Sequence, residues 1–78
     1  MKARILVVDD EESIREFLNI MLRKEGYDVT CVEDGQKAID ILKKKSFEMV
    51  ISDLQMPHVT GLELLKFVKE NYSDTLFM

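Results

Sequence analysis

Short apolar runs alternate with helical repeats along this chain, and the alternation restricts the fold more than any other feature. The first run, residues 5–8, is continuous and rich in β-branched residues, which is typical of a strand buried on both faces. Further strand-like runs cover residues 29–32, 49–51 and 75–78. Between them, apolar residues recur at helical spacing over residues 14–22, 38–42 and 61–72. The predicted order is therefore βαβαβαβ.

Strands that alternate with helices through short loops predict an open, parallel α/β sheet. In a flavodoxin-like doubly wound sheet, strands numbered along the chain would take the order 2-1-3-4. The second run, residues 29–32, alternates more than the first, as expected of an edge strand. No helical pattern follows residues 75–78, so we expect residues 1–78 to form a partial, truncated domain that ends within or just after the fourth strand.

Length and charge narrow the functional class. The chain has 78 residues, 15 acidic and 11 basic, with a net charge of -4, which argues against a nucleic-acid-binding surface. Its single cysteine, Cys31, cannot form an intrachain disulfide. The apolar run that ends at Val8 is too short for a signal peptide or a membrane span, so we expect a cytoplasmic protein with no membrane contact. The five methionines are expected mostly at core-facing positions.

Three aspartates follow the ends of predicted strands. Asp9 and Asp10 close the first strand, and Asp53 closes the third. Ligands of open parallel sheets bind at the carboxyl ends of the strands, where the strand order reverses. In the order 2-1-3-4, the first and third strands are neighbours, so these carboxylates should converge.

Clustered carboxylates repel each other, and a divalent cation relieves that repulsion. At a separation near 4 Å, each pair costs about 1 kcal/mol in water and about 4 kcal/mol at an effective dielectric constant of 20. Oxygen ligands with open positions for water and phosphate suit Mg²⁺. Taken singly, Asp9 and Asp10 could instead cap the first helix, and Asp53 could simply end its strand. Three carboxylates on adjacent strands exceed those needs.

The motif around Asp53 carries a family resemblance. The acidic pair, the segment Asp53-Leu54-Gln55-Met56-Pro57 and Gly61 together resemble the signature of receiver domains of two-component response regulators. The resemblance runs along the whole chain but covers only the first part of that five-stranded fold. It implies that Met56 and Pro57 shape the loop beside the phosphate. Gly61 would permit a sharp entry into the third helix.

The resemblance also implies individual roles. Asp53 matches the phosphoacceptor, and Asp10 matches the direct ligand of Mg²⁺. Asp9 matches the acid that holds metal-bound water, and the main-chain carbonyl of Gln55 would be a further protein ligand. The family's phosphate-contacting Ser or Thr and Lys would lie beyond residue 78. Thr75 lies at the start of the fourth strand and does not substitute for them.

Three functions remain open from the sequence. The chain could be a signalling module, not an enzyme, that accepts a phosphoryl group from a sensor histidine kinase of the parent system. It could be a Mg²⁺-dependent aspartyl phosphohydrolase, although Gln55 stands where such enzymes usually have a second acid. It could also be a crippled fragment that acts only as a self-associating α/β unit. We expect a homo-oligomer, most simply a symmetric dimer joined near residues 76–78, because an unprotected edge strand there invites pairing.

Overall fold

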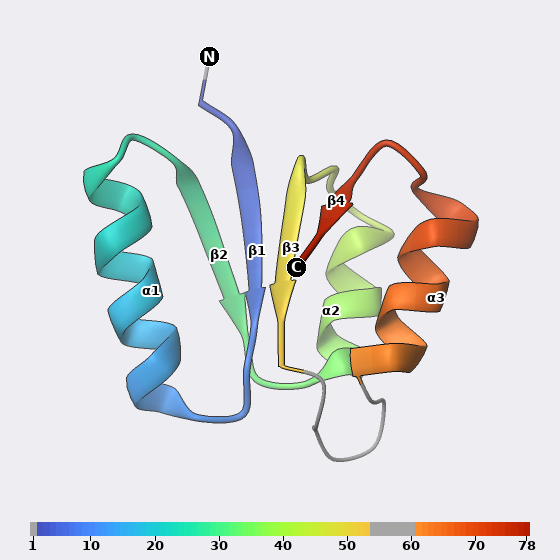
Figure 1. Ribbon diagram of the computed structural model, residues 1–78, viewed down its shortest axis with the longest axis horizontal. Coiled ribbons are helices and arrows are strands. Elements are labelled where there is room, and N and C mark those ends of the chain that lie inside the picture. Colours follow the sequence, from blue (N-terminus) through green and yellow to red (C-terminus); the bar gives the residue numbers. More distant parts are fainter. Residues whose placement is uncertain (1, 54–60) are drawn as a thin grey trace.

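The computed structural model describes residues 2–53 and 61–78 as a parallel four-stranded sheet flanked by helices on both faces (Figure 1). The strand order is β2-β1-β3-β4, with every neighbouring pair parallel. The strands are β1 (Arg4–Val8), β2 (Asp28–Val32), β3 (Met49–Ser52) and β4 (Leu76–Phe77). The predicted fold class and strand order are therefore confirmed.

The three helices divide between the two faces of the sheet. They are α1 (Glu12–Lys24), α2 (Gly35–Leu42) and α3 (Gly61–Asn71). Figure 1 shows α1 on one face and α2 with α3 on the other. Among the residues that the structure describes, no helix combines the length and the apolar character needed to cross a bilayer.

Residues 5–8 of the central strand β1 are all apolar because both faces of the sheet are covered there. Leu6 and Val8 pack into the core formed with α2 and α3, while Ile5 and Val7 pack into a smaller core against α1. Because side chains alternate along a strand, a strand covered on both faces has no position left for a polar residue. The apolar side chains of β1 thus pack against helices on both faces of the sheet.

Two local signals mark the ends of helices. Gly26, just after α1, has φ of 91°, a left-handed conformation that favours glycine at this position. Asp34-Gly35 is a dipeptide that often marks a turn, but here it begins α2. The Asp34 carboxylate accepts a hydrogen bond from the backbone N–H of Lys37 at 2.8 Å, so Asp34 is the N-cap of that helix.

The outer side of α1 differs from the expectation of a buried apolar face. Every residue of this helix is at least partly exposed, including Ile14, Phe17 and Met21 at 39%, 59% and 46%. Met78 is 69% exposed, so the placement of the methionines mostly toward the core is wrong for Met21 and Met78. Only one flank of α1 meets its sheet, through Leu18 and Leu22.

Candidate functional site

The site begins with the register of the two central strands. Val8, the last residue of β1, pairs with Val32 of β2 and with Ser52 of β3. The ladder continues one residue further, since the N–H of Asp53 donates to the carbonyl of Val8 at 3.1 Å. On the other side, the N–H of Asp9 donates to the carbonyl of Val32 at 3.2 Å. Both acidic segments are thereby held at the carboxyl edge of the sheet.

Asp9, Asp10 and Asp53 converge as the sequence predicted. One carboxylate oxygen from each residue can be chosen so that all three lie within 4.8 Å of one another. Asp9 is buried, with 8% of its surface exposed, whereas Asp10 and Asp53 are exposed. The cluster therefore has one buried and two exposed aspartates, and solvent can reach it at the two exposed residues.

Asp9 is fixed by the turn into α1. Its Oδ1 accepts a hydrogen bond from the N–H of Glu11 at 2.9 Å, and its carbonyl oxygen accepts one from Nη1 of Arg15 at 2.7 Å. The N-cap of α1 is Glu11, and its side chain accepts no capping hydrogen bond from the described residues. Helix capping by Asp9 or Asp10 therefore does not account for the acidic pair, although Asp9 does support the turn.

The donor set fits a hard divalent cation. Three carboxylates this close repel one another, and among the described residues only Asp9, Asp10 and Asp53 form such a group. Carboxylate oxygens at a solvent-facing edge leave room for water ligands, which Mg²⁺ usually retains. A cation bound here would be held by Asp9, Asp10 and Asp53.

Other residues singled out by the sequence fall elsewhere. Gln55, Met56 and Pro57 lie outside the described residues, so their expected roles stay predictions. Gly61 is buried and begins α3.

Thr75 lies at the opposite end of the sheet from the carboxylates. It is buried there, and its hydroxyl donates to the carbonyl of Phe47 at 2.8 Å. This hydrogen bond joins the segment before β4 to the segment before β3. Thr75 therefore does not replace the family's phosphate-contacting hydroxyl, as the sequence predicted.

Arg15 is a residue that the sequence interpretation missed. Its guanidinium bonds the main chain of Asp9 and so braces the acidic turn against α1. The available signal was its spacing, because Arg15 lies three and seven residues before Leu18 and Leu22, on the flank of α1 that meets the sheet.

Comparisons with known proteins agree with this geometry. The sequence profile of the response regulator receiver domain matches residues 5–77. The structure of chemotaxis response regulator CheY4 of Vibrio cholerae is 37% identical, with a TM-score of 0.95 over 99% of this chain and 66% of that chain. Response regulator TrrA from Thermotoga maritima, solved in complex with Mg(2+)-BeF, is 39% identical, with a TM-score of 0.92 and the same coverage of each chain.

A further solved structure contains a partner. It shows TrrA in complex with the histidine kinase ThkA and matches this chain at 39% identity, with a TM-score of 0.90 over 99% of this chain and 66% of that one. This chain thus spans just under two thirds of the length of these structures. The profile match covers nearly all 78 residues and the fold agrees throughout, so the chain belongs to the response regulator receiver domain family.

Proposed function

We propose that this chain is the phosphoacceptor part of a response regulator and that Asp53 takes a phosphoryl group in a Mg²⁺-dependent reaction. The observation that carries the proposal is the cluster of Asp9, Asp10 and Asp53 at the carboxyl edge of the sheet. Asp53 directly follows β3 and is exposed. A nucleophile that reacts with a large phosphodonor must be accessible in this way. The ladder hydrogen bond from its N–H to Val8 fixes the main chain beneath it.

The roles within the cluster follow from position. An oxygen of Asp53 would attack phosphorus, so that a carboxylate–phosphorus bond forms as the donor's bond to phosphorus breaks. Asp10 and Asp9 would hold Mg²⁺, with Asp9 fixed by Glu11 and Arg15 and Asp10 on the solvent side. The bound ion supplies positive charge against the phosphoryl oxygens. The main-chain carbonyl of Gln55 remains a proposed further ligand.

The proposed phosphodonor is a phosphohistidine of a sensor histidine kinase. TrrA, which shares 39% identity with this chain, was solved together with such a kinase. The phosphohydrolase alternative is not favoured, because Gln55 lacks the acid that such chemistry usually places there. The chain would then be a signalling domain whose output depends on the charge state of Asp53.

Labelling by a small phosphodonor tests the proposal. Incubation with acetyl phosphate and Mg²⁺ should add one phosphoryl group, detected by intact mass, and chelation of the metal should prevent the addition. Asp53→Asn should abolish labelling, because an amide is a poor nucleophile. We expect slow labelling of the 78-residue chain, since no lysine or hydroxyl that stabilises the transferring group is predicted within it.

Asp74→Asn provides the matched control, because Asp74 is an exposed aspartate beside Thr75 at the opposite end of the sheet. This variant should label like the unchanged chain. Labelling that survives Asp53→Asn, or an unchanged chain that takes no label, would overturn the proposal.

A further inference from the structure

Arg15 is half-buried, although most of helix α1 is exposed. It lies on the flank of α1 that faces the sheet, together with Leu18, Asn19 and Leu22. Within the described part of the chain, its guanidinium forms no ion pair with a carboxylate. Nη1 donates instead to the main-chain carbonyl of Asp9 at 2.7 Å. The charged end of Arg15 is therefore used to hold the main chain of one residue of the carboxylate cluster.

The carbonyl of Asp9 belongs to the peptide bond that joins Asp9 to Asp10. Because a peptide bond is planar, holding this oxygen sets the direction in which the chain enters Asp10. Two other hydrogen bonds hold Asp9, from its N–H to the carbonyl of Val32 at 3.2 Å and from the N–H of Glu11 to its Oδ1 at 2.9 Å. Neither involves the Asp9–Asp10 peptide. Of the hydrogen bonds among the described residues, only the one from Arg15 orients that peptide.

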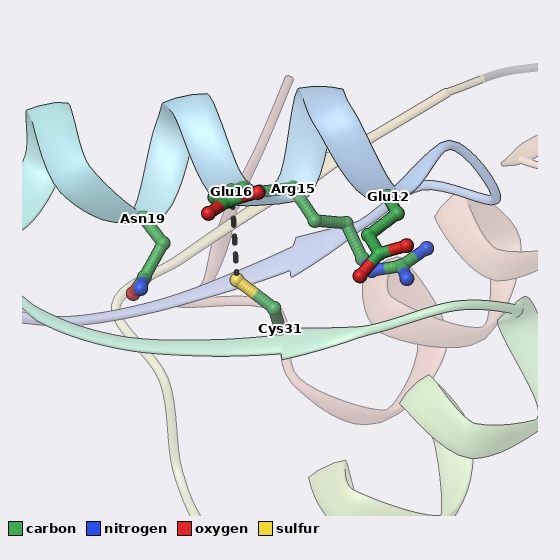
Figure 2. Close-up of a pocket in the computed structure, with 5 residues that line it drawn as sticks. All are labelled: Glu12, Arg15, Glu16, Asn19 and Cys31. Carbon is green, nitrogen blue, oxygen red and sulfur yellow. Dashed lines mark hydrogen bonds between the residues drawn. The ribbon is translucent and has the colours of Figure 1, made fainter.

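The main chain of Arg15 is itself held in place. Its N–H donates to the carbonyl of Glu11 at 3.1 Å, and its carbonyl oxygen lies 3.8 Å from Sγ of Cys31, which donates to it from β2. Figure 2 shows this second contact, and it shows the Arg15 side chain extending along α1 toward Glu12. Long side chains on helices usually point toward the N-terminus in this way. Arg15 is thus fixed both at its main chain and at its guanidinium.

We propose that Arg15 is a positioning residue for Mg²⁺ and that it orients the peptide between Asp9 and Asp10 before the ion binds. The inference rests on the proposed function of the cluster formed with Asp53. Carboxylates that lie within 4.8 Å of one another repel, and without a cation they tend to move apart. A fixed peptide between two of them limits that movement, so less conformational freedom is lost when the ion binds.

The charge of Arg15 has the opposite effect on affinity. A guanidinium that acted only through its charge would repel a cation bound nearby, so its removal would strengthen Mg²⁺ binding. A guanidinium that acts by orienting the ligands favours binding, so its removal would weaken it. The sign of the change therefore separates the two roles.

Titration of the 78-residue chain with MgCl₂, followed by amide shifts in NMR spectra, measures the dissociation constant. Arg15→Gln should raise it by about tenfold, the lower end of the range for groups outside the first coordination sphere. Arg15→Lys retains the charge on a shorter side chain without the planar guanidinium. It should raise the dissociation constant too, by a smaller factor than Arg15→Gln.

Arg23→Gln is the matched control, because Arg23 makes the same kind of bond at the other end of α1. Its Nη2 donates to the carbonyl of Val29 at 2.9 Å. Val29 pairs with Ile5, four residues before Asp9, which places this bond about 13 Å from Asp9 along the strand. Arg23→Gln should lower the midpoint of urea denaturation, as Arg15→Gln should, but it should leave the dissociation constant for Mg²⁺ unchanged.

The outcomes separate this inference from the proposed function. A dissociation constant for Arg15→Gln at or below that of the unchanged chain, or an equal rise in Arg23→Gln, would refute the positioning role and leave the proposed function intact. If Arg15→Gln does not fold, Arg15→Lys decides, and an unchanged dissociation constant in that variant refutes the role. An unchanged chain without Mg²⁺-dependent shifts near the carboxylate cluster would refute the proposed function together with this inference.

Discussion

Asp9 and Asp10 are adjacent in the sequence, but their surroundings separate their roles. The Asp9 carboxylate is buried and accepts a hydrogen bond from the N–H of Glu11, so removing its charge would also disturb the turn into α1. Asp10 is exposed beside it. A substitution at Asp10 therefore tests the proposed metal site with less effect on the fold than a substitution at Asp9.

The first prediction concerns Mg²⁺ affinity. Titration with MgCl₂, followed by amide shifts in NMR spectra, should perturb residues near Asp9, Asp10 and Asp53. Asp10→Asn should weaken binding by at least about tenfold, since even groups outside the first coordination sphere change metal affinity by about 10- to 100-fold. Asp74→Asn should bind as the unchanged chain does. Shifts spread over the whole surface would contradict a defined site.

The second prediction concerns the thiol of Cys31. Burial raises its pKa, an effect only partly offset by the nearby charges of Arg15 and Arg23. The folded thiol should therefore react with iodoacetamide more slowly at pH 8 than the thiol of the urea-unfolded chain. Its contribution to stability is present below the ordinary thiol pKa and is lost as the pH rises through the folded value. Equal alkylation rates in the two states would show that the thiol is not shielded.

At the scale of elements, the end of α1 and the burial of β1 depend on local signals that can be recognised in the sequence. Gly26 ends α1 in the left-handed conformation, and β1 is buried on both faces as its unbroken apolar sequence indicated. The outward face of α1 could not be predicted in the same way. Periodicity shows that a helix has an apolar side, but whether Phe17 is covered depends on what packs beside the helix in space.

The third prediction concerns the N-cap of α2. Asp34→Ala removes the acceptor for the N–H of Lys37 and should lower the free energy of unfolding by about 1 kcal/mol. Asp34→Ser should recover most of that loss. Urea denaturation measures both values, with Asp74→Ala, at an exposed aspartate outside the helices, as the control. An Asp34→Ala midpoint equal to that of the unchanged chain would mean that the cap contributes nothing.

At the scale of the molecule, the sheet order and the carboxylate cluster share one cause. Parallel strands joined by helices place all their carboxyl ends on one edge, so Asp9, Asp10 and Asp53 could be brought together from sequence alone. The unequal covering of the two faces of the sheet could not be predicted from the sequence. It arises because two helices pack on one face and α1 alone packs on the other, which leaves Leu76 and Met78 exposed.

That unequal cover leads to the last prediction, that folding and association of this chain are linked. If only folded chains associate into dimers, each tenfold rise in protein concentration adds about 1.4 kcal/mol to the free energy of unfolding per dimer, or about 0.7 kcal/mol per chain. For a chain of this size, that corresponds to a rise of about 4 °C in Tm. Thermal melts at concentrations spanning two decades measure the slope. A Tm that stays constant with concentration in the unchanged chain would show that the two small cores sustain the fold without a partner.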